Sequence, residues 1–430
     1  IDVILQDRPD LVLIPGDLTK DGEFVSHQQV VSILHRLTDA GIRTLVVPGN
    51  HDIDNPYGVC YLGDKTMPAE RTSPEQFEQL YCDFGYDTRS ERDPVSLSYA
   101  CEPIDGLVML CIDSNRYGDN LYKDRGDSID YNQTAGRIRE ATLQWMCQQA
   151  DAARSQGKQV AVMMHHNIVE HYDGQEFFHA PYIISDWQSV ADTMMAHDIH
   201  LAFTGHQHLQ DIAQYRRWRV GNNGDAVIDS LVDVATGSTI TYPNPWRRIS
   251  LNEDFTEWAV ETGYVKAIPS VSDVQTMCKE RLATHIQGGL AWIINDYWSV
   301  AEEYRSKLAL MGMPKFLPTT PSATCDLLMK YMGDTLIESY LTYNEGNEWQ
   351  SGRSDLLLNG IEEQLMDMVR YRVTKSAPVL LWKTYTQTVY QMAAEKILPS
   401  LRSILADTNQ MQDDTGLRSI TDDLSVVLHF

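Results

Sequence analysis

Four short apolar segments of this chain each end in side chains that can bind a metal ion. The segments and the residues that follow them are 11–14 before Pro15-Gly16-Asp17, 45–47 before Pro48-Gly49-Asn50-His51-Asp52, 160–164 before His165-His166-Asn167, and 201–204 before Gly205-His206-Gln207-His208. Apolar runs of this length are typical of buried strands. Because the carboxyl ends of parallel strands open into one crevice where ligands bind, we expect these four segments to meet at one edge of a sheet.

The first 265 residues alternate between short apolar runs and helical patterns, which predicts a layered α/β domain. The expected strands are 10–15, 43–48, 107–113, 159–164 and 200–204, and the expected helices are 24–40, 134–155 and 185–197. The consecutive segments 212–220, 226–235, 238–242, 248–251 and 257–265 then read as a second, mostly antiparallel sheet. We expect the two sheets to pack face to face between helices, as an α/β/β/α sandwich.

From about residue 266 helical periodicity replaces the strand patterns and continues to the end of the chain. Ile361, Leu365, Met368 and Val369, for example, follow the i, i+4, i+7, i+8 spacing of one helix face. We therefore divide the chain into a catalytic domain over residues 1–265 and a helical C-terminal domain or coat over residues 266–430.

The residue types at the four strand ends suit a pair of transition-metal ions. Imidazole favours Zn, Fe and similar ions, and a carboxylate can bridge two cations. The alternating residues His206 and His208 fit one ligand for each ion. Two ions about 3.5 to 4 Å apart would clamp a phosphate and activate a shared water. A lone G-D pair indicates little, whereas G-N-H-D after an apolar strand, with the other segments in order, is a specific pattern.

The order G-D, G-N-H-[DE], H and G-H-x-H resembles the signature of the calcineurin-like metallophosphoesterases. The matching residues are Gly16-Asp17, Gly49-Asn50-His51-Asp52, His165 and Gly205-His206-Gln207-His208, and the resemblance covers roughly residues 1–260. Thr236-Gly237-Ser238 and Tyr242-Pro243 resemble the second sheet of the bacterial cyclic-nucleotide phosphodiesterase-like and purple-acid-phosphatase-like branches. The resemblance implies hydrolysis of a phosphomonoester or phosphodiester of a small substrate by metal-activated hydroxide. It does not extend to the helical C-terminal region.

The resemblance also implies two divalent or transition-metal ions, with Fe, Mn and Zn left open. Asp17 would bridge both ions. One ion would be bound by Asn50, His165 and His206, and the other by His208. We prefer His165 to the next histidine as the ligand because His165 follows the apolar run directly.

Four further residues are expected around the metals. By the same resemblance His51 would bind no metal and would stabilise the transition state or protonate the leaving oxygen, with Asp52 orienting its ring. His166 would then face the substrate or support the ligands from behind. Asn115, just after the apolar run 107–113, is a candidate substrate contact, although such a residue is more often part of an ordinary loop.

One motif of the family is absent from the sequence. The pattern normally opens with D-x-H on the strand before Asp17, which supplies ligands to the ion that His208 also binds. Nothing in residues 1–10 matches it. We attribute the gap to a missing N-terminal segment, and we expect a chain that began at Ile1 to bind one metal well and to catalyse poorly.

The net charge of the chain helps to discriminate between the functions known in this family. The chain carries 60 acidic and 35 basic residues, a formal net charge of −25. Nucleic-acid binding needs a basic surface that releases counterions, so a nuclease is disfavoured. A binding or scaffold protein that keeps the fold without catalysis is the other alternative: the absent D-x-H motif favours it, and the intact His51 and G-H-x-H segment oppose it. No apolar stretch approaches the roughly 18 to 20 residues that span a bilayer.

Cysteine usage and the family resemblance point to different compartments. Seven cysteines occur without C-x-x-C spacing, and Cys101, Cys111 and Cys147 sit inside apolar or helical patterns. We interpret them as reduced core cysteines, which favours the cytoplasm. Resemblance to exported bacterial phosphoesterases slightly favours the periplasm or cell surface.

Overall fold

The computed structural model describes residues 1–87, 89–220, 226–296, 320–346, 352–396, 411–412, 419–420 and 423–430, together with residues 398, 402 and 405. Its main helices are α1 (Asp2–Asp7), α2 (Phe24–Asp39), α3 (Pro74–Leu80), α4 (Glu140–Ser155), α5 (Gln175–Phe178), α6 (Trp187–Ala196), α7 (Val274–Asp296), α9 (Pro321–Glu345), α10 (Arg353–Ser376) and α11 (Trp382–Lys396). Its strands are β1 (Leu11–Ile14), β2 (Arg43–Val46), β3 (Val59–Leu62), β4 (Lys65–Pro68), β5 (Glu91–Arg92), β6 (Tyr99–Ile104), β7 (Leu107–Ile112), β8 (Gln159–Met164), β9 (Leu201–Thr204), β10 (Asp211–Val220), β11 (Ala226–Ala235), β12 (Pro245–Leu251), β13 (Glu257–Tyr264), β14 (Met411–Gln412), β15 (Ser419–Ile420) and β16 (Ser425–His429).

The largest sheet has seven strands in the order β10-β11-β9-β8-β7-β6-β5. Strands β7, β8, β9 and β11 are parallel neighbours, and antiparallel strands lie at both edges. The strands predicted at 107–113, 159–164 and 200–204 are confirmed as β7, β8 and β9. Their apolar runs are unbroken because both faces of the sheet are buried. In β7, Met109 and Cys111 enter one hydrophobic core, whereas Leu110 and Ile112 enter the other.

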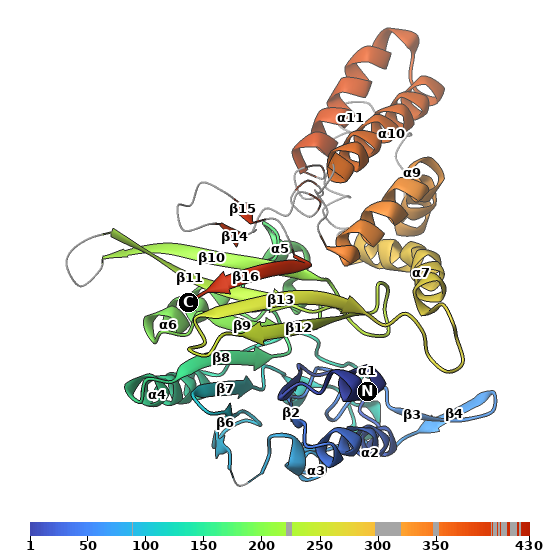
Figure 1. Cartoon of the computed structure of the whole chain (residues 1–430). Helices are drawn as coiled ribbons and strands as arrows, with labels where there is room; N and C mark the ends of the chain where they lie inside the picture. The colour runs from blue at the N-terminus through green and yellow to red at the C-terminus, as the bar shows by residue number, and fades with distance from the viewer. Residues whose placement is uncertain are drawn as a thin grey trace.

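The layers on the two faces of this sheet make the sandwich (Figure 1). On one face, α4 and α6 supply Met146 and Met194 to the shared core. On the other face lie the parallel pair β1–β2 and the antiparallel sheet β12-β13-β16. There the Phe203 and Trp258 rings pack with centroids 5.9 Å apart, and Leu37 of α2 joins the same core. The predicted α/β/β/α class is thereby confirmed.

The membership of the second sheet differs from the prediction. Segments 212–220 and 226–235 extend the first sheet as β10 and β11, because β11 pairs in parallel with β9 over residues 232–235. Residues 238–242 form no strand. The second sheet instead recruits β16 from the end of the chain, which pairs with β13. Strand patterns indicate extended backbone, but they do not specify which strand becomes the neighbour.

The region after residue 266 is helical, as predicted, with α7, α9, α10 and α11 standing beside the sheets (Figure 1). Helical structure does not continue to the end, because β16 returns to the sandwich. Its burial alternates, with Val426 and Leu428 inside, which is the period-2 pattern of a half-buried strand. Within the described part of the chain, none of the helices combines the length and the apolar character needed to cross a bilayer.

Candidate metal site

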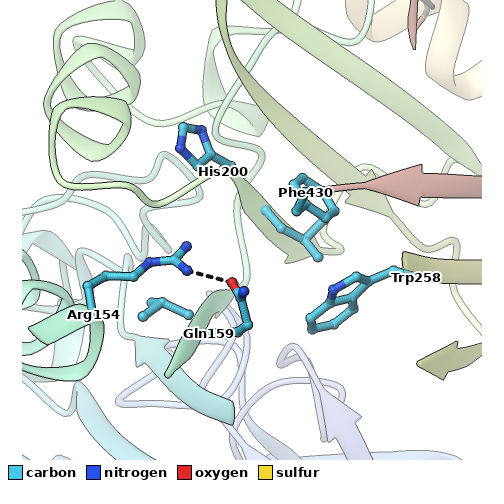
Figure 2. Close-up of a pocket in the computed structure, with 7 residues that line it drawn as sticks. Arg154, Gln159, His200, Trp258 and Phe430 are labelled. Atoms are coloured by element: carbon cyan, nitrogen blue, oxygen red, sulfur yellow. Dashed lines mark hydrogen bonds between the residues drawn. The ribbon is translucent and has the colours of Figure 1, made fainter. Parts of the chain in front are cut away.

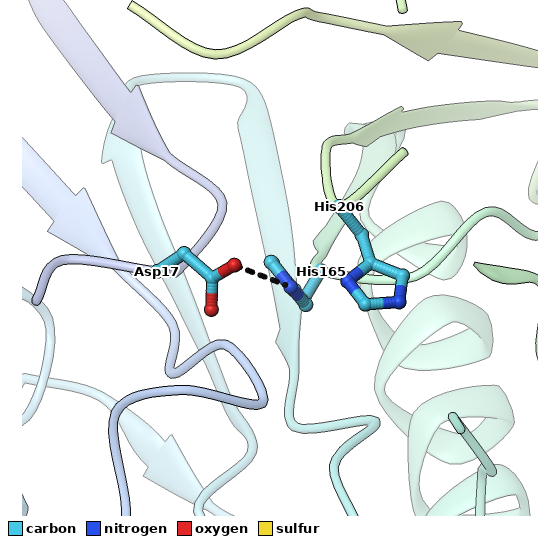
Figure 3. Close-up of side chains that lie close together, drawn as sticks. All are labelled: Asp17, His165 and His206. Atoms are coloured by element: carbon cyan, nitrogen blue, oxygen red, sulfur yellow. Dashed lines mark ion pairs between the residues drawn. The ribbon is translucent and has the colours of Figure 1, made fainter. Parts of the chain in front are cut away.

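Donor side chains from four strand ends meet at one edge of the sandwich. Asp17, His165 and His206 carry ligand atoms that all lie within 4.8 Å of one another (Figure 3). Asp17 Oδ2 lies 3.4 Å from His165 Nε2, and Asn50 Oδ1 lies 3.1 Å from the same nitrogen. These residues follow β1, β2, β8 and β9 within four residues. The four strands were expected in one sheet, but β1 and β2 form a separate parallel pair, so the donors come from the ends of two parallel pairs in two layers.

The spacing of these atoms fits a shared metal ion. Ligand atoms bound at about 2.1 Å around one tetrahedral or octahedral ion lie roughly 3.0 to 3.5 Å apart. The two distances at His165 Nε2 fall within this range. Asn50 supports the same interpretation, because its buried Nδ2 has no hydrogen-bond partner among the described residues while its Oδ1 points at the donor cluster. This amide orientation fits a cation bound at the oxygen, which without a metal ion accepts from His165 Nε2.

Backbone carbonyls fix the tautomers of the two buried histidines. His165 Nδ1 donates to the carbonyl oxygen of Pro15 at 2.7 Å, which leaves Nε2 free to bind a metal. His206 Nε2 donates to the carbonyl oxygen of Pro181 at 3.1 Å, which leaves Nδ1 free. A hydrogen bond from the far nitrogen of a metal ligand is the usual device that orients the ring.

Burial and mutual contact set the charges of the cluster. Burial lowers the pKa of His206 well below its usual range, so this imidazole is neutral, as a ligand must be. Burial alone would raise the pKa of the Asp17 carboxyl, but the His165 ring holds it well below its ordinary value. The cluster therefore presents an anionic Asp17 oxygen and a neutral His206 ring. Burial alone would lower the pKa of His165, but the Asp17 carboxylate raises it, so a metal ion would displace a proton from His165 Nε2 on binding.

Tight backbone turns bring the loops together. A Cβ on Gly16, whose φ is +93°, would lie 2.5 Å from the Gly49 nitrogen, and a Cβ on Gly49 would lie 2.2 Å from Asp17 Oδ1. Asp17 and His206 have φ values of 54° and 63°, in the left-handed region. Such conformations in residues other than glycine cost about 1 to 3 kcal/mol each and cluster at functional sites.

Asp52 has a different position from the one predicted. It is fully buried and joins the loops of Asp17 and Gly49: its carboxylate accepts from the backbone N–H groups of Leu18, Thr19 and Gly49 at 3.1, 2.9 and 2.8 Å. These bonds occupy the carboxylate, so the expected orienting contact with the His51 ring is not what the geometry shows.

Asp21 is the carboxylate beside His51. Its Oδ1 lies 3.4 Å from His51 Nδ1, and its other oxygen pairs with Lys20. Burial alone would lower the pKa of His51, but the Asp21 hydrogen bond and the Asp17 charge raise it to about 9. Asp21 was not predicted, because no motif marks it; its only signal in the sequence is its place four residues after Asp17.

His208 stays outside the donor cluster. Its side chain is exposed, and its backbone is left-handed with φ of 60°. Among the residues that the structure describes, the close group of metal-capable donors is Asp17, His165 and His206, without this histidine.

The two expected substrate contacts point into the protein. His166 is buried; its Nε2 donates to the Thr134 carbonyl at 2.9 Å and its Nδ1 lies 2.8 Å from Ser114 Oγ, so neither ring nitrogen is left for a substrate. Its ring packs on His206 with centroids 4.4 Å apart, which fits the supporting role. Asn115 is also buried, and its Nδ2 donates to the Pro48 carbonyl at 2.6 Å, so it holds the start of the G-N-H-D loop.

A buried ionic cluster behind the site was not anticipated from the sequence. His171 Nδ1 lies 2.6 Å from Asp211 Oδ2, and its Nε2 lies 3.4 Å from Asp233 Oδ2. Asp233 also accepts from the Ile168 backbone N–H at 2.8 Å and from Thr204 Oγ1 at 2.6 Å. The cluster thus ties together the two loops that carry His165 and His206.

A small pocket lies away from this chemistry (Figure 2). Its lining residues are Arg154, Gln159, Val160, His200, Leu201, Trp258 and Phe430. Several of them stand at the starts of β8 and β9, roughly 15 to 20 Å from the strand ends that carry the metal donors. The pocket is therefore separate from the metal site.

Residues 1–210 match the family described as calcineurin-like phosphoesterase. Among solved structures, a dimetal phosphatase from Danio rerio aligns with a TM-score of 0.39 and 12% identity, over 60% of this chain and 82% of that chain. No curated protein matches the sequence.

Proposed function

Residues 1–210 belong to the calcineurin-like phosphoesterases, a family of metal-dependent hydrolases, and from this premise we propose that the chain hydrolyses a phosphomonoester or phosphodiester bond of a small substrate. The observation that carries the proposal is the convergence of Asp17, Asn50, His165 and His206, with donor spacings suited to one shared ion. The negative charge of the chain favours a small substrate over a nucleic acid.

In this proposal the first metal position uses Asp17, Asn50, His165 and His206, and the second uses Asp17 and His208. When bound, such ions neutralise developing charge on phosphate oxygens and lower the pKa of a water. The chain's own contribution is to hold the His165 and His206 rings in one orientation and to fix the Asp17 carboxylate between the loops. The hydrogen bonds from His165 to the Pro15 carbonyl and from His206 to the Pro181 carbonyl hold the two rings.

His51 is placed to act on the leaving group. Its side chain is 41% exposed, and its Nδ1 faces Asp21, so Nε2 has no protein hydrogen bond among the described residues. The His51 backbone N–H also donates to Asp17 Oδ1 at 3.1 Å, which fixes the ring beside the metal donors. We assign to His51 the transfer of a proton to the departing oxygen.

Removing the His51 ring tests this function. With Mn²⁺ or Zn²⁺ supplied, the parent should hydrolyse bis(p-nitrophenyl) phosphate or p-nitrophenyl phosphate, and His51→Ala should lower kcat by about 100- to 10,000-fold, as expected for loss of a general acid. His285→Ala, on the exposed face of α7, is the matched control and should leave kcat unchanged. A parent without activity on either ester under both metals would reject the enzyme and favour a scaffold.

Asp21 and Asp52 should respond differently to the same isosteric change. Asp21→Asn weakens the carboxylate hydrogen bond to the His51 ring, so we expect kcat to fall about 10- to 100-fold with little change in thermal midpoint. Asp52→Asn places an N–H₂ group against backbone donors and should cost about 1 to 3 kcal/mol of stability. Measuring kcat and thermal midpoint on both variants separates the roles. Loss of activity without destabilisation in Asp52→Asn alone would restore Asp52 as the orienting group.

We also propose the division of the chain near residue 265, into the metal-binding sandwich and a helical unit built from α7, α9, α10 and α11. Strand β16, near the end of the chain, pairs with β13 of the sandwich. The helical unit is therefore inserted in the sequence between β13 and β16.

A further inference from the structure

The last turn of α9 contacts the loop that carries His206 and His208. Gln207, between these two histidines, donates from Nε2 to the Tyr343 hydroxyl oxygen at 2.6 Å. Gly346 comes so close that a Cβ there would lie 2.3 Å from the Gln210 carbonyl oxygen. Glu345 accepts from the Tyr242 hydroxyl at 2.5 Å, beyond the same loop. The helical unit is therefore docked on the metal-binding loop through several independent contacts.

Gln207 has both ends of its amide engaged. Its Oε1 accepts from Gln175 Nε2 at 2.8 Å, while its Nε2 is bound to Tyr343. Gln175 in turn donates to Asn167 Oδ1 at 3.1 Å, and Asn167 follows His165 and His166 directly. A continuous hydrogen-bonded chain therefore runs from the loop after β8, through the loop after β9, to α9.

The loop needs such support because its backbone is strained. His206 and His208 both have left-handed φ values, 63° and 60°. Residues other than glycine keep such a conformation only where the surroundings over-determine it. Gln175 fixes one side of the intervening Gln207 from within the sandwich. Tyr343 fixes the other side, from a helix outside the residues that match the family.

We infer that Tyr343 is a positioning residue for the two metal-binding histidines, and that the helical unit sets the geometry of the metal site through it. The inference rests on the proposed metal binding by His206 and His208. If this inference is correct, the C-terminal helices help to position the metal-binding histidines. Tyr343 itself touches neither metal nor substrate in this scheme and acts only through Gln207.

Tyr343→Phe tests the inference, because it removes the hydroxyl oxygen and keeps the ring that packs on Tyr172, with centroids 6.2 Å apart. Titration with Co²⁺, followed by its visible absorption spectrum and by chelator competition, should show a dissociation constant raised about 10-fold and an altered ligand-field spectrum. Tyr340→Phe makes the same change one turn earlier on α9, at a side chain 44% exposed, and should leave both readouts as in the parent. Parent-like Co²⁺ affinity and spectrum in Tyr343→Phe would overturn the inference.

A second variant guards against an effect of misfolding. Gln207→Met removes both hydrogen bonds at nearly constant volume, and the double variant with Tyr343→Phe should bind Co²⁺ no more weakly than Gln207→Met alone, because both changes break one interaction. Additive losses would count against the coupling. The Co²⁺ titration does not depend on turnover, so the two proposals can fail separately. If the parent hydrolyses no phosphoester but Tyr343→Phe still binds Co²⁺ more weakly than the parent, the inference is upheld and the proposed function is rejected.

Discussion

Replacing Asp17 with asparagine should strip the site of its metal and lower phosphoester hydrolysis by about 1,000-fold or more, since a metal clamp on phosphate supplies several kcal/mol of transition-state stabilisation. Asparagine matches aspartate in size and also tolerates a left-handed backbone, so the φ of 54° at this position is not an obstacle. What disappears is the only anionic oxygen in the donor cluster of Asp17, His165 and His206. Metal content after dialysis, measured by mass spectrometry, should fall together with kcat.

Asp93→Asn is the matched control for this change. Asp93 is another buried carboxylate, and it accepts hydrogen bonds from Thr142 at 2.7 Å and from Ser96, neither of which is a metal donor. The control should lose stability and keep its metal content. An Asp17→Asn protein that retained parental metal and activity would mean that the cluster is not the metal site.

The donor cluster was predictable from the sequence because each of its parts is local. A strand ends, a metal-capable side chain follows within a few residues, and parallel pairing brings the ends together within each pair, β1–β2 and β8–β9. Packing of the two sheets then joins the two pairs of ends. Asp17, Asn50, His165 and His206 needed no knowledge of which strands are neighbours. The second sheet did need that knowledge, and there the prediction assigned β10 and β11 to the wrong sheet and missed β16. Nothing local marks β16, because Val426, Val427 and Leu428 are all apolar, and the burial of only the first and third follows from pairing with β13.

The partner of His51 shows the limit of reasoning from adjacency. Asp52 follows it in sequence, yet side chains of consecutive residues diverge in extended or turning backbone, and Asp52 is drawn inward by three backbone N–H groups. Asp21, 30 residues away, reaches the ring instead. Pairings of this kind depend on how the loops pack, which local patterns do not specify.

The same limit applies to the ionic cluster of His171, Asp211 and Asp233, whose members come from three separate segments. Substituting His171 with glutamine should destabilise the protein by about 3 to 5 kcal/mol near pH 6, because removing one partner leaves two buried carboxylates without their cation. This is a large share of the roughly 5 to 15 kcal/mol that stabilises an ordinary domain. The denaturant midpoint of the parent and the variant measures the loss.

The loss should also depend on pH in a defined direction. Burial alone would lower the pKa of His171, but the Asp211 and Asp233 carboxylates raise it to about 10, against about 6.5 in an unfolded chain. A group with a raised folded pKa stabilises fully below its unfolded value, and the stabilisation fades as pH rises toward the folded one. The gap between parent and His171→Gln should therefore be widest near pH 6 and narrow steadily toward pH 10.

A surface pair of the same chemistry provides the control for this last prediction. His197 Nδ1 lies 2.8 Å from Asp151 Oδ1, but the two side chains are 35% and 59% exposed. Exposed pairs contribute about 0 to 1 kcal/mol, because water already solvates both charges. His197→Gln should therefore shift the midpoint little at any pH. If His171→Gln behaved in the same way, or if its loss were equal at pH 6 and pH 10, the buried imidazole would not be the cation that holds the two metal-bearing loops together.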